Sequence, residues 1–138
     1  MSSLKSASAF VQGRSHEKND IPCQDRTYEL VTKGFGAIAL ADGAGSCEAS
    51  HIGAHHITKT VVHYIKKRFA YLTKLKYPHK HLQKQIENDL KWLAQTKKKE
   101  FKELSSTLLF VVIKNGRFIA GHIGGVFKIL CQPDIIKI

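Results

Sequence analysis

The sequence predicts an α+β fold with a largely antiparallel sheet, and the order of three patterns along the chain leads to that prediction. Strand-like segments fill much of the first third, helical periodicity occupies residues 49–95, and strand-like segments return after residue 105. Strands that precede and follow a helical block, instead of alternating with helices, favour antiparallel pairing. A chain of 138 residues fits one domain, so we expect residues 1–138 to form a single one.

Two neighbouring strands are expected before the helical block. Residues 26–32 favour a strand, residues 33–34 favour a turn, and residues 36–41 are small or aliphatic without a charge. A short uncharged run is typical of a strand that is covered on both faces. If the two strands pair antiparallel, Asp25 and Asp42 lie at the same end of the sheet.

The helical block divides at Pro78 into two predicted helices, the first from about residue 49 to 72 and the second ending near residue 95. Both carry apolar residues at helical spacing, which predicts amphipathic helices. The apolar residues are Ile57, Val61, Ile65 and Phe69 in the first, and Leu82, Ile86, Leu90 and Leu93 in the second.

A hairpin is predicted after the helices. Residues 106–113 and 118–124 are strand-like, and Asn115-Gly116 lies between them, which is the strongest local signal for a hairpin turn. A third strand-like run covers residues 126–131. His122 lies inside an apolar run, which favours a histidine satisfied within the core.

The chain is strongly basic, with a net charge of +11, and the charge is concentrated in the helical block. Between Lys59 and Lys102 there are 13 Lys or Arg residues and three acidic ones. Such a segment can attract nucleic acid, anionic lipid or acidic protein. A solvated helical surface is the simpler interpretation, because no aromatic residues are expected to lie between the lysines as stacking platforms for bases. Nucleic acid is therefore not the expected partner. A non-enzymatic basic module that binds an acidic partner or nucleic acid remains the alternative function.

The sequence predicts a cytoplasmic protein. It has no run of about 18 apolar residues that would span a membrane, and its first ten residues do not resemble a secretory signal. The three cysteines, Cys23, Cys47 and Cys131, are odd in number and widely spaced, which argues against a disulfide framework.

Asp25 and Asp42 are the leading candidates for a metal site. Hard divalent cations prefer carboxylate and carbonyl oxygens, and Gly43 can offer its carbonyl at close range. Either aspartate could instead cap a turn. His51 and His55, four residues apart on the first predicted helix, form a weaker transition-metal candidate because no local Glu or Cys completes the set.

Three separated stretches resemble the PPM-type (type 2C) metal-dependent serine/threonine protein phosphatase family, in its bacterial branch. They are residues 13–16 with 22–25 (Gly-Arg-Ser-His and Pro-Cys-Gln-Asp), residues 41–46 (Ala-Asp-Gly-Ala-Gly-Ser), and residues 106–109 continuing to 121–124. The resemblance implies an antiparallel β-sandwich flanked by helices, with its C-terminal part missing from this chain, and a phosphorylated protein as substrate.

The resemblance also implies roles for individual residues. Asp42 would bridge two metal ions, Mn²⁺ or Mg²⁺, while the Gly43 carbonyl would bind one and Asp25 the other, directly or through water. A metal-activated water would then attack the phosphorus of a phosphomonoester. Arg14 or His16 would contact the phosphate.

Two departures from the family pattern predict weak or absent turnover. Gly124 is followed directly by Gly125, where members usually carry an Asp between the glycines. The later Ser-Asp-Gly and Asp-Asn motifs that supply further metal ligands are also missing, and Asp134 matches neither. The resemblance therefore implies a truncated or degenerate phosphatase domain whose metal site is incomplete.

Overall fold

The computed structural model describes residues 5, 23, 25–124 and 128–129, and all structural statements below concern these residues. The predicted phosphate contacts Arg14 and His16 lie outside them, as does most of the third strand-like run after the hairpin. No helix among the described residues is long and apolar enough to cross a bilayer.

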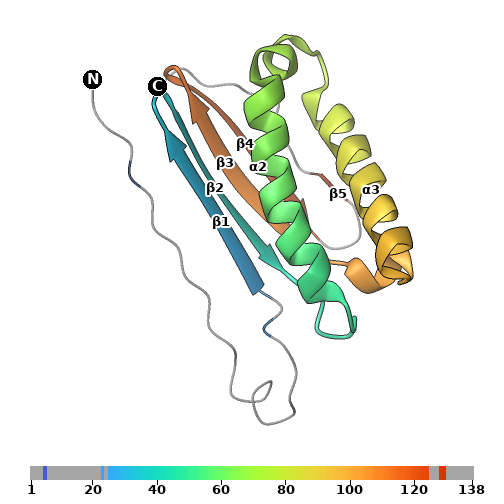
Figure 1. Ribbon diagram of the computed structural model, residues 1–138. Coiled ribbons are helices and arrows are strands. Elements are labelled where there is room, and N and C mark those ends of the chain that lie inside the picture. Colours follow the sequence, from blue (N-terminus) through green and yellow to red (C-terminus); the bar gives the residue numbers. More distant parts are fainter. Residues whose placement is uncertain (1–4, 6–22, 24, 125–127, 130–138) are drawn as a thin grey trace.

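One antiparallel sheet forms the centre of the fold (Figure 1). Its strands follow one another in sequence order, each paired antiparallel with the next. They are β1 (Asp25–Thr32), β2 (Phe35–Asp42), β3 (Leu108–Lys114), β4 (Arg117–Gly124) and the short β5 (Lys128–Ile129). The predicted α+β class is therefore confirmed. The described residues form a single sheet, and a sandwich of two sheets stays a prediction.

Two long helices cover one face of this sheet (Figure 1). Helix α2 (Ser50–Lys74) packs on β1, β2 and β3, and α3 (Pro78–Lys97) packs on α2. The fixed φ of Pro78 suits the first turn of α3. Both predicted helices are confirmed, each continuing about two residues past its expected end. A 3₁₀ turn, η1 (Phe101–Leu104), leads from α3 into β3.

The core lies between the helices and the sheet because side chains alternate along each strand. On β2, Phe35, Ala37, Ala39 and Ala41 are buried beneath α2. The intervening Leu40 is 41% exposed on the opposite face, beside Leu109 of β3 at 47%. The expectation that residues 36–41 are covered on both faces is therefore wrong for the described residues, because the helices α2 and α3 cover only one face of the sheet. An antiparallel sheet tolerates such a one-sided arrangement.

The two hairpin turns lie side by side at one end of the sheet. Asn115 and Gly116 both have positive φ values, 51° and 75°, which is the backbone geometry of a tight hairpin turn. The predicted Asn-Gly hairpin is thus confirmed. The Asn115 N–H donates a hydrogen bond of 3.2 Å to the carbonyl of Gly34 in the β1–β2 turn, so each turn supports the other.

A glycine brings the start of α2 against η1. A Cβ added at Gly53 would lie 2.1 Å from the carbonyl oxygen of Leu104, far inside normal contact distance. Leu104 is fully buried. This close approach fixes the position of residues 105–107, which follow η1 directly and contact the end of β2.

Candidate metal centre

The β1–β2 hairpin places Asp25 and Asp42 directly opposite each other. They are paired across the two strands at the end of the sheet away from the connecting turn. Both side chains are exposed. A hydrogen bond with the Asp25 carboxyl, followed by partial removal from water and repulsion from the Asp25 charge, raises the pKa of Asp42 above its ordinary value of 3.8. Two carboxyl groups in contact in this way share a proton readily, or a cation.

Thr107 holds the backbone of Asp42 in place. The Asp42 N–H donates to Thr107 Oγ1 at 3.1 Å, and the Thr107 N–H donates to the Asp42 carbonyl at 2.9 Å. These bonds extend the β2–β3 pairing to the candidate ligand. Thr107 is not among the site residues that the sequence predicts. Its position could have suggested the role, because a hydroxyl residue directly before an apolar strand can bond to the end of the neighbouring strand.

Gly43 continues this attachment and leaves its own carbonyl outside it. Gly43 and Ser106 form an isolated antiparallel bridge. The hydrogen bonds of this bridge are made by the residues on either side of Gly43 and Ser106. One of them, 2.9 Å long, runs from the Ala44 N–H to the Ser105 carbonyl. In such a pair the carbonyl of the central residue points away from the partner segment. The Gly43 oxygen is thereby directed away from Ser106, on the side where β1 lies.

A hollow of about 570 Å³ opens beside the two aspartates on the face of the sheet that the described helices leave uncovered. Its lining residues come from the ends of β1, β2 and β4 and the start of β3. They are Asp25, Arg26, Thr27, Leu40, Ala41, Asp42, Thr107, Leu108, Leu109 and His122. A phosphorylated side chain is small enough to enter an open hollow of this volume.

His122 is exposed in this hollow, so the prediction of a core histidine is wrong. It is paired across the strands with Leu109, which is also exposed. Its neighbours Ile119 and Ile123 are buried towards the helices. Because successive strand side chains point to opposite faces, His122 faces the uncovered side. The apolar run around it concealed this alternation.

Positive charge lies next to the aspartate pair. The Arg26 guanidinium donates hydrogen bonds to the backbone carbonyls of Cys23 and Asp25, the latter at 2.7 Å, which fixes the chain where β1 begins.

Burial, and then the charges of Arg26 and Lys99, lower the pKa of His51 at the start of α2. His51 is therefore more often neutral than an ordinary histidine at the same pH.

The described residues favour the aspartate pair over the histidine pair as a cation site. His51 is half-buried and His55 is exposed, both on α2. Among the residues that the structure describes, no group of three His, Cys, Asp or Glu side chains is arranged to hold a metal ion. The oxygens of Asp25, Asp42 and Gly43 are hard ligands and suit Mg²⁺ or Mn²⁺. These oxygens supply only part of the ligands that such an ion needs.

The described residues thus form an α+β arrangement in which two paired aspartates lie at one end of an antiparallel sheet with helices on one face. The family model described as protein phosphatase 2C matches residues 12–134, a range that includes both aspartates. The chain therefore belongs to the protein phosphatase 2C family. A comparison with curated proteins gave no match.

Proposed function

We propose that the chain is a metal-dependent phosphoprotein phosphatase domain that binds Mn²⁺ or Mg²⁺ through Asp25, Asp42 and the Gly43 carbonyl. The cross-strand pairing of the two aspartates is the observation that supports it most directly. Two acidic groups in contact repel when both are ionised, and a divalent cation removes that repulsion. The family match supports phosphate chemistry for the site.

Different residues of the chain would bind the metal ion and the phosphate. Asp42, held by Thr107, and Asp25 would hold the cation with their carboxylates. A bound divalent cation supplies Lewis acidity, which neutralises phosphate charge and lowers the pKa of a water ligand. Arg14 and His16, outside the described residues, are the proposed phosphate contacts.

The proposed substrate is a phosphorylated protein. The hollow beside Asp42 lies on the face of the sheet away from α2 and α3 and is open among the described residues, so a phosphorylated residue on a protein surface could reach it. A cytoplasmic location fits the odd number and wide spacing of the three cysteines. We further propose that the 138-residue chain hydrolyses phosphomonoesters weakly or not at all, because its described residues supply only part of a metal site.

Titration calorimetry with Mn²⁺ tests the metal site. We expect binding heat from the unaltered chain and none from Asp42→Asn, which removes one carboxylate charge. Glu29→Gln is the matched control, since Glu29 is an exposed acid on β1 outside the pair, and it should bind as the unaltered chain does. An unaltered chain that gives no metal-dependent heat would refute the site.

Hydrolysis of p-nitrophenyl phosphate and of a phosphothreonine peptide tests the second part of the proposal. We expect little turnover with saturating Mn²⁺. Rapid hydrolysis that disappears in Asp42→Asn would show that the site is functionally complete, and would overturn the proposal of weak activity while supporting the location of the metal.

A further inference from the structure

The topology gathers three chain connections at the end of the molecule opposite Asp25 and Asp42 (Figure 1). They are the β1–β2 turn, the β3–β4 turn and the α2–α3 connection at residues 75–77. The two turns are joined by the hydrogen bond between Asn115 and Gly34. Lys66 of α2 places its Nζ 5.3 Å from the centre of the ring of Phe35, the residue after the β1–β2 turn, so α2 contacts the sheet at this turn.

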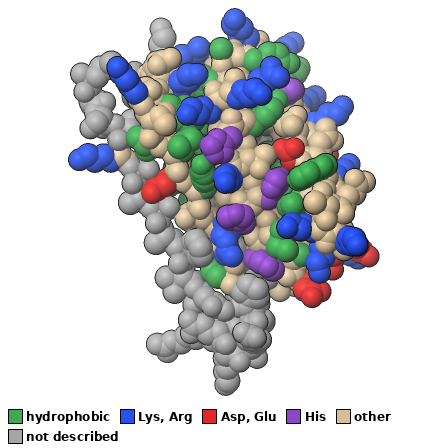
Figure 2. All heavy atoms as spheres, viewed as in Figure 1, with side chains coloured by type: hydrophobic (Ala, Val, Ile, Leu, Met, Phe, Trp, Pro, Cys, Tyr) green, Lys and Arg blue, Asp and Glu red, His purple; other side chains and the backbone are tan. Residues whose placement is uncertain are grey.

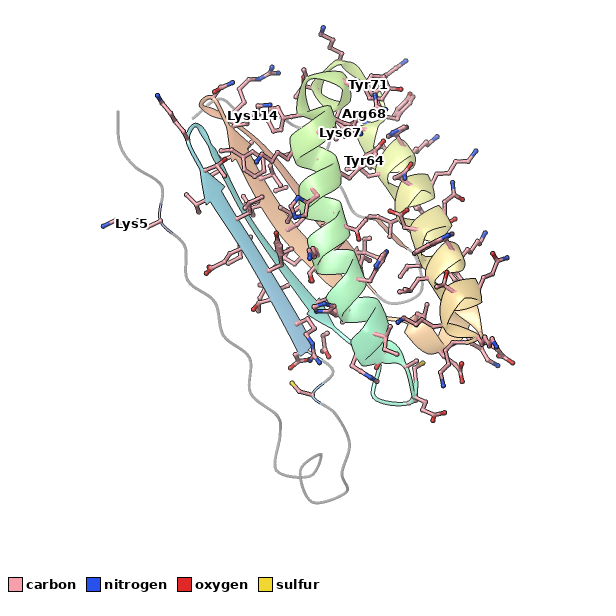
Figure 3. All side chains as sticks on the ribbon, viewed as in Figure 1. Lys5, Tyr64, Lys67, Arg68, Tyr71 and Lys114 are labelled. Carbon is pink, nitrogen blue, oxygen red and sulfur yellow. The ribbon has the colours of Figure 1, made fainter. Side chains whose placement is uncertain are left out.

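Lysine and arginine side chains concentrate at this end, which we call the basic end. Figure 2 shows them gathered over the tops of the helices, and Figure 3 shows that Lys67 and Arg68 come from α2 and Lys114 from the end of β3. The residues of the basic end are Lys33, Lys66, Lys67, Arg68, Lys74, Lys76, Lys80, Lys114 and Arg117. Within the described ranges 30–41, 64–86 and 108–124 there is no Asp or Glu. The positive potential here is therefore uncompensated by acids of the same segments.

Two exposed aromatic rings lie among these cations. Tyr71 is 47% exposed and Tyr77 is 50% exposed. The Nζ atoms of Lys76 and Lys80 lie 5.4 Å and 4.9 Å from the centre of the Tyr77 ring. A solvated helical surface, which the charge pattern alone favours, does not need half-exposed rings between its lysines. Rings combined with flexible cations are the recognition elements of proteins that bind single-stranded nucleic acid.

We propose that the basic end binds single-stranded nucleic acid, with its lysines and arginines on the phosphates and Tyr71 and Tyr77 stacked on bases. A duplex hides its base faces and would leave the tyrosines without stacking partners, whereas a single strand presents successive flat bases together with its phosphates. The aspartate pair lies at the far end of β1, about 23 Å away for a strand of this length. This separation exceeds the screening length at physiological salt, about 8 Å, so the acids do not weaken the site.

Fluorescence anisotropy with a labelled oligothymidylate of about 16 nucleotides tests the proposal. Binding that neutralises about four phosphates should weaken by about 50-fold between ~50 and ~200 mM salt. The measurement is made without divalent cations and repeated with Asp42→Asn, which should bind equally well. Nucleic-acid binding is in this way separated from the proposed phosphatase function.

Matched variants assign the binding to the basic end. Replacing Tyr71 or Tyr77 with alanine should weaken binding about tenfold for each ring. Trp92→Ala is the control, because Trp92 is 60% exposed on α3 but lies about 21 Å along the helix from Pro78. Trp92→Ala should leave the affinity unchanged. Thermal melting of each variant confirms that it is folded.

A second pair of variants tests the charges independently of the rings. Lys76→Gln with Lys80→Gln should weaken binding and make it less dependent on salt, whereas Lys59→Gln with Lys97→Gln, also exposed on the helices, should not. Equal losses in both pairs, no effect of the tyrosine variants, or binding to phosphatidylserine vesicles without binding to the oligonucleotide would each overturn the proposal.

Discussion

Gly53 is the position where a single added methyl group should disturb both the fold and the candidate metal centre. In Gly53→Ala the new Cβ would meet the Leu104 carbonyl oxygen at 2.1 Å, a contact that only a backbone shift can relieve. Overpacking of this kind costs about 2–3 kcal/mol. The higher helix propensity of alanine offsets about 1 kcal/mol of that cost. The net expectation is a loss of about 1–2 kcal/mol in the free energy of unfolding.

Thermal unfolding followed by circular dichroism measures this loss. At this chain length, about 1–2 kcal/mol corresponds to a midpoint lower by roughly 3–10 °C. The control is Ala70→Gly, an exposed position of α2, which changes helix propensity alone and should cost about 1 kcal/mol. If Gly53→Ala instead raises the midpoint, helix propensity dominates and the inferred close contact between α2 and η1 is wrong. A shift of η1 should also weaken Mn²⁺ binding, because residues 105–107 position Asp42.

The remaining predictions concern the hydrogen bonds and protons of the aspartate pair. Thr107→Val leaves the Asp42 N–H without its acceptor and should cost about 1 kcal/mol, measured by thermal melting, whereas Thr107→Ser keeps the hydroxyl and should cost less. The raised pKa of Asp42 means that protons compete with the cation, so Mn²⁺ affinity measured by calorimetry should rise with pH through that raised value and then level off. Without metal, the folded chain keeps this proton to a higher pH than the unfolded chain, so stability should fall as pH rises from 3.8 through the raised value. Asp25→Asn removes the Asp25 carboxyl, which is the largest cause of the raised pKa of Asp42, and an undiminished pH dependence of its melting midpoint would contradict this assignment.

Local chain geometry explains why the aspartate pair was predictable. A turn at residues 33–34 between two strands leaves few possible registers, and an antiparallel hairpin brings Asp25 and Asp42 to one end in the observed one. The hairpin turn at Asn115-Gly116 was predictable for a similar reason, because the preference for positive φ is intrinsic to these residue types. In both cases the information lies within a few residues.

Features that depend on the choice of face or on distant packing were not predictable in this way. His122 lies in an apolar run that suits either a two-sided or a one-sided sheet, and only the location of both helices on one face exposes it. The basic end likewise depends on three connections that are far apart in sequence. The expectation that no aromatic side chains lie between the lysines is wrong, because Tyr71 of α2 and Tyr77 of the α2–α3 connection are exposed among them.

The contact between Asp42 and Thr107 joins residues separated by 65 positions in the chain. The aspartates themselves approach through a local hairpin, but their support comes from a strand that follows both helices. Bringing such distant segments together costs chain entropy, which is recovered only when the helices and β3 are packed. A cation held by the supported pair would therefore bind the folded chain in preference to the unfolded one, and its concentration would shift the folding equilibrium of the whole described sheet by mass action.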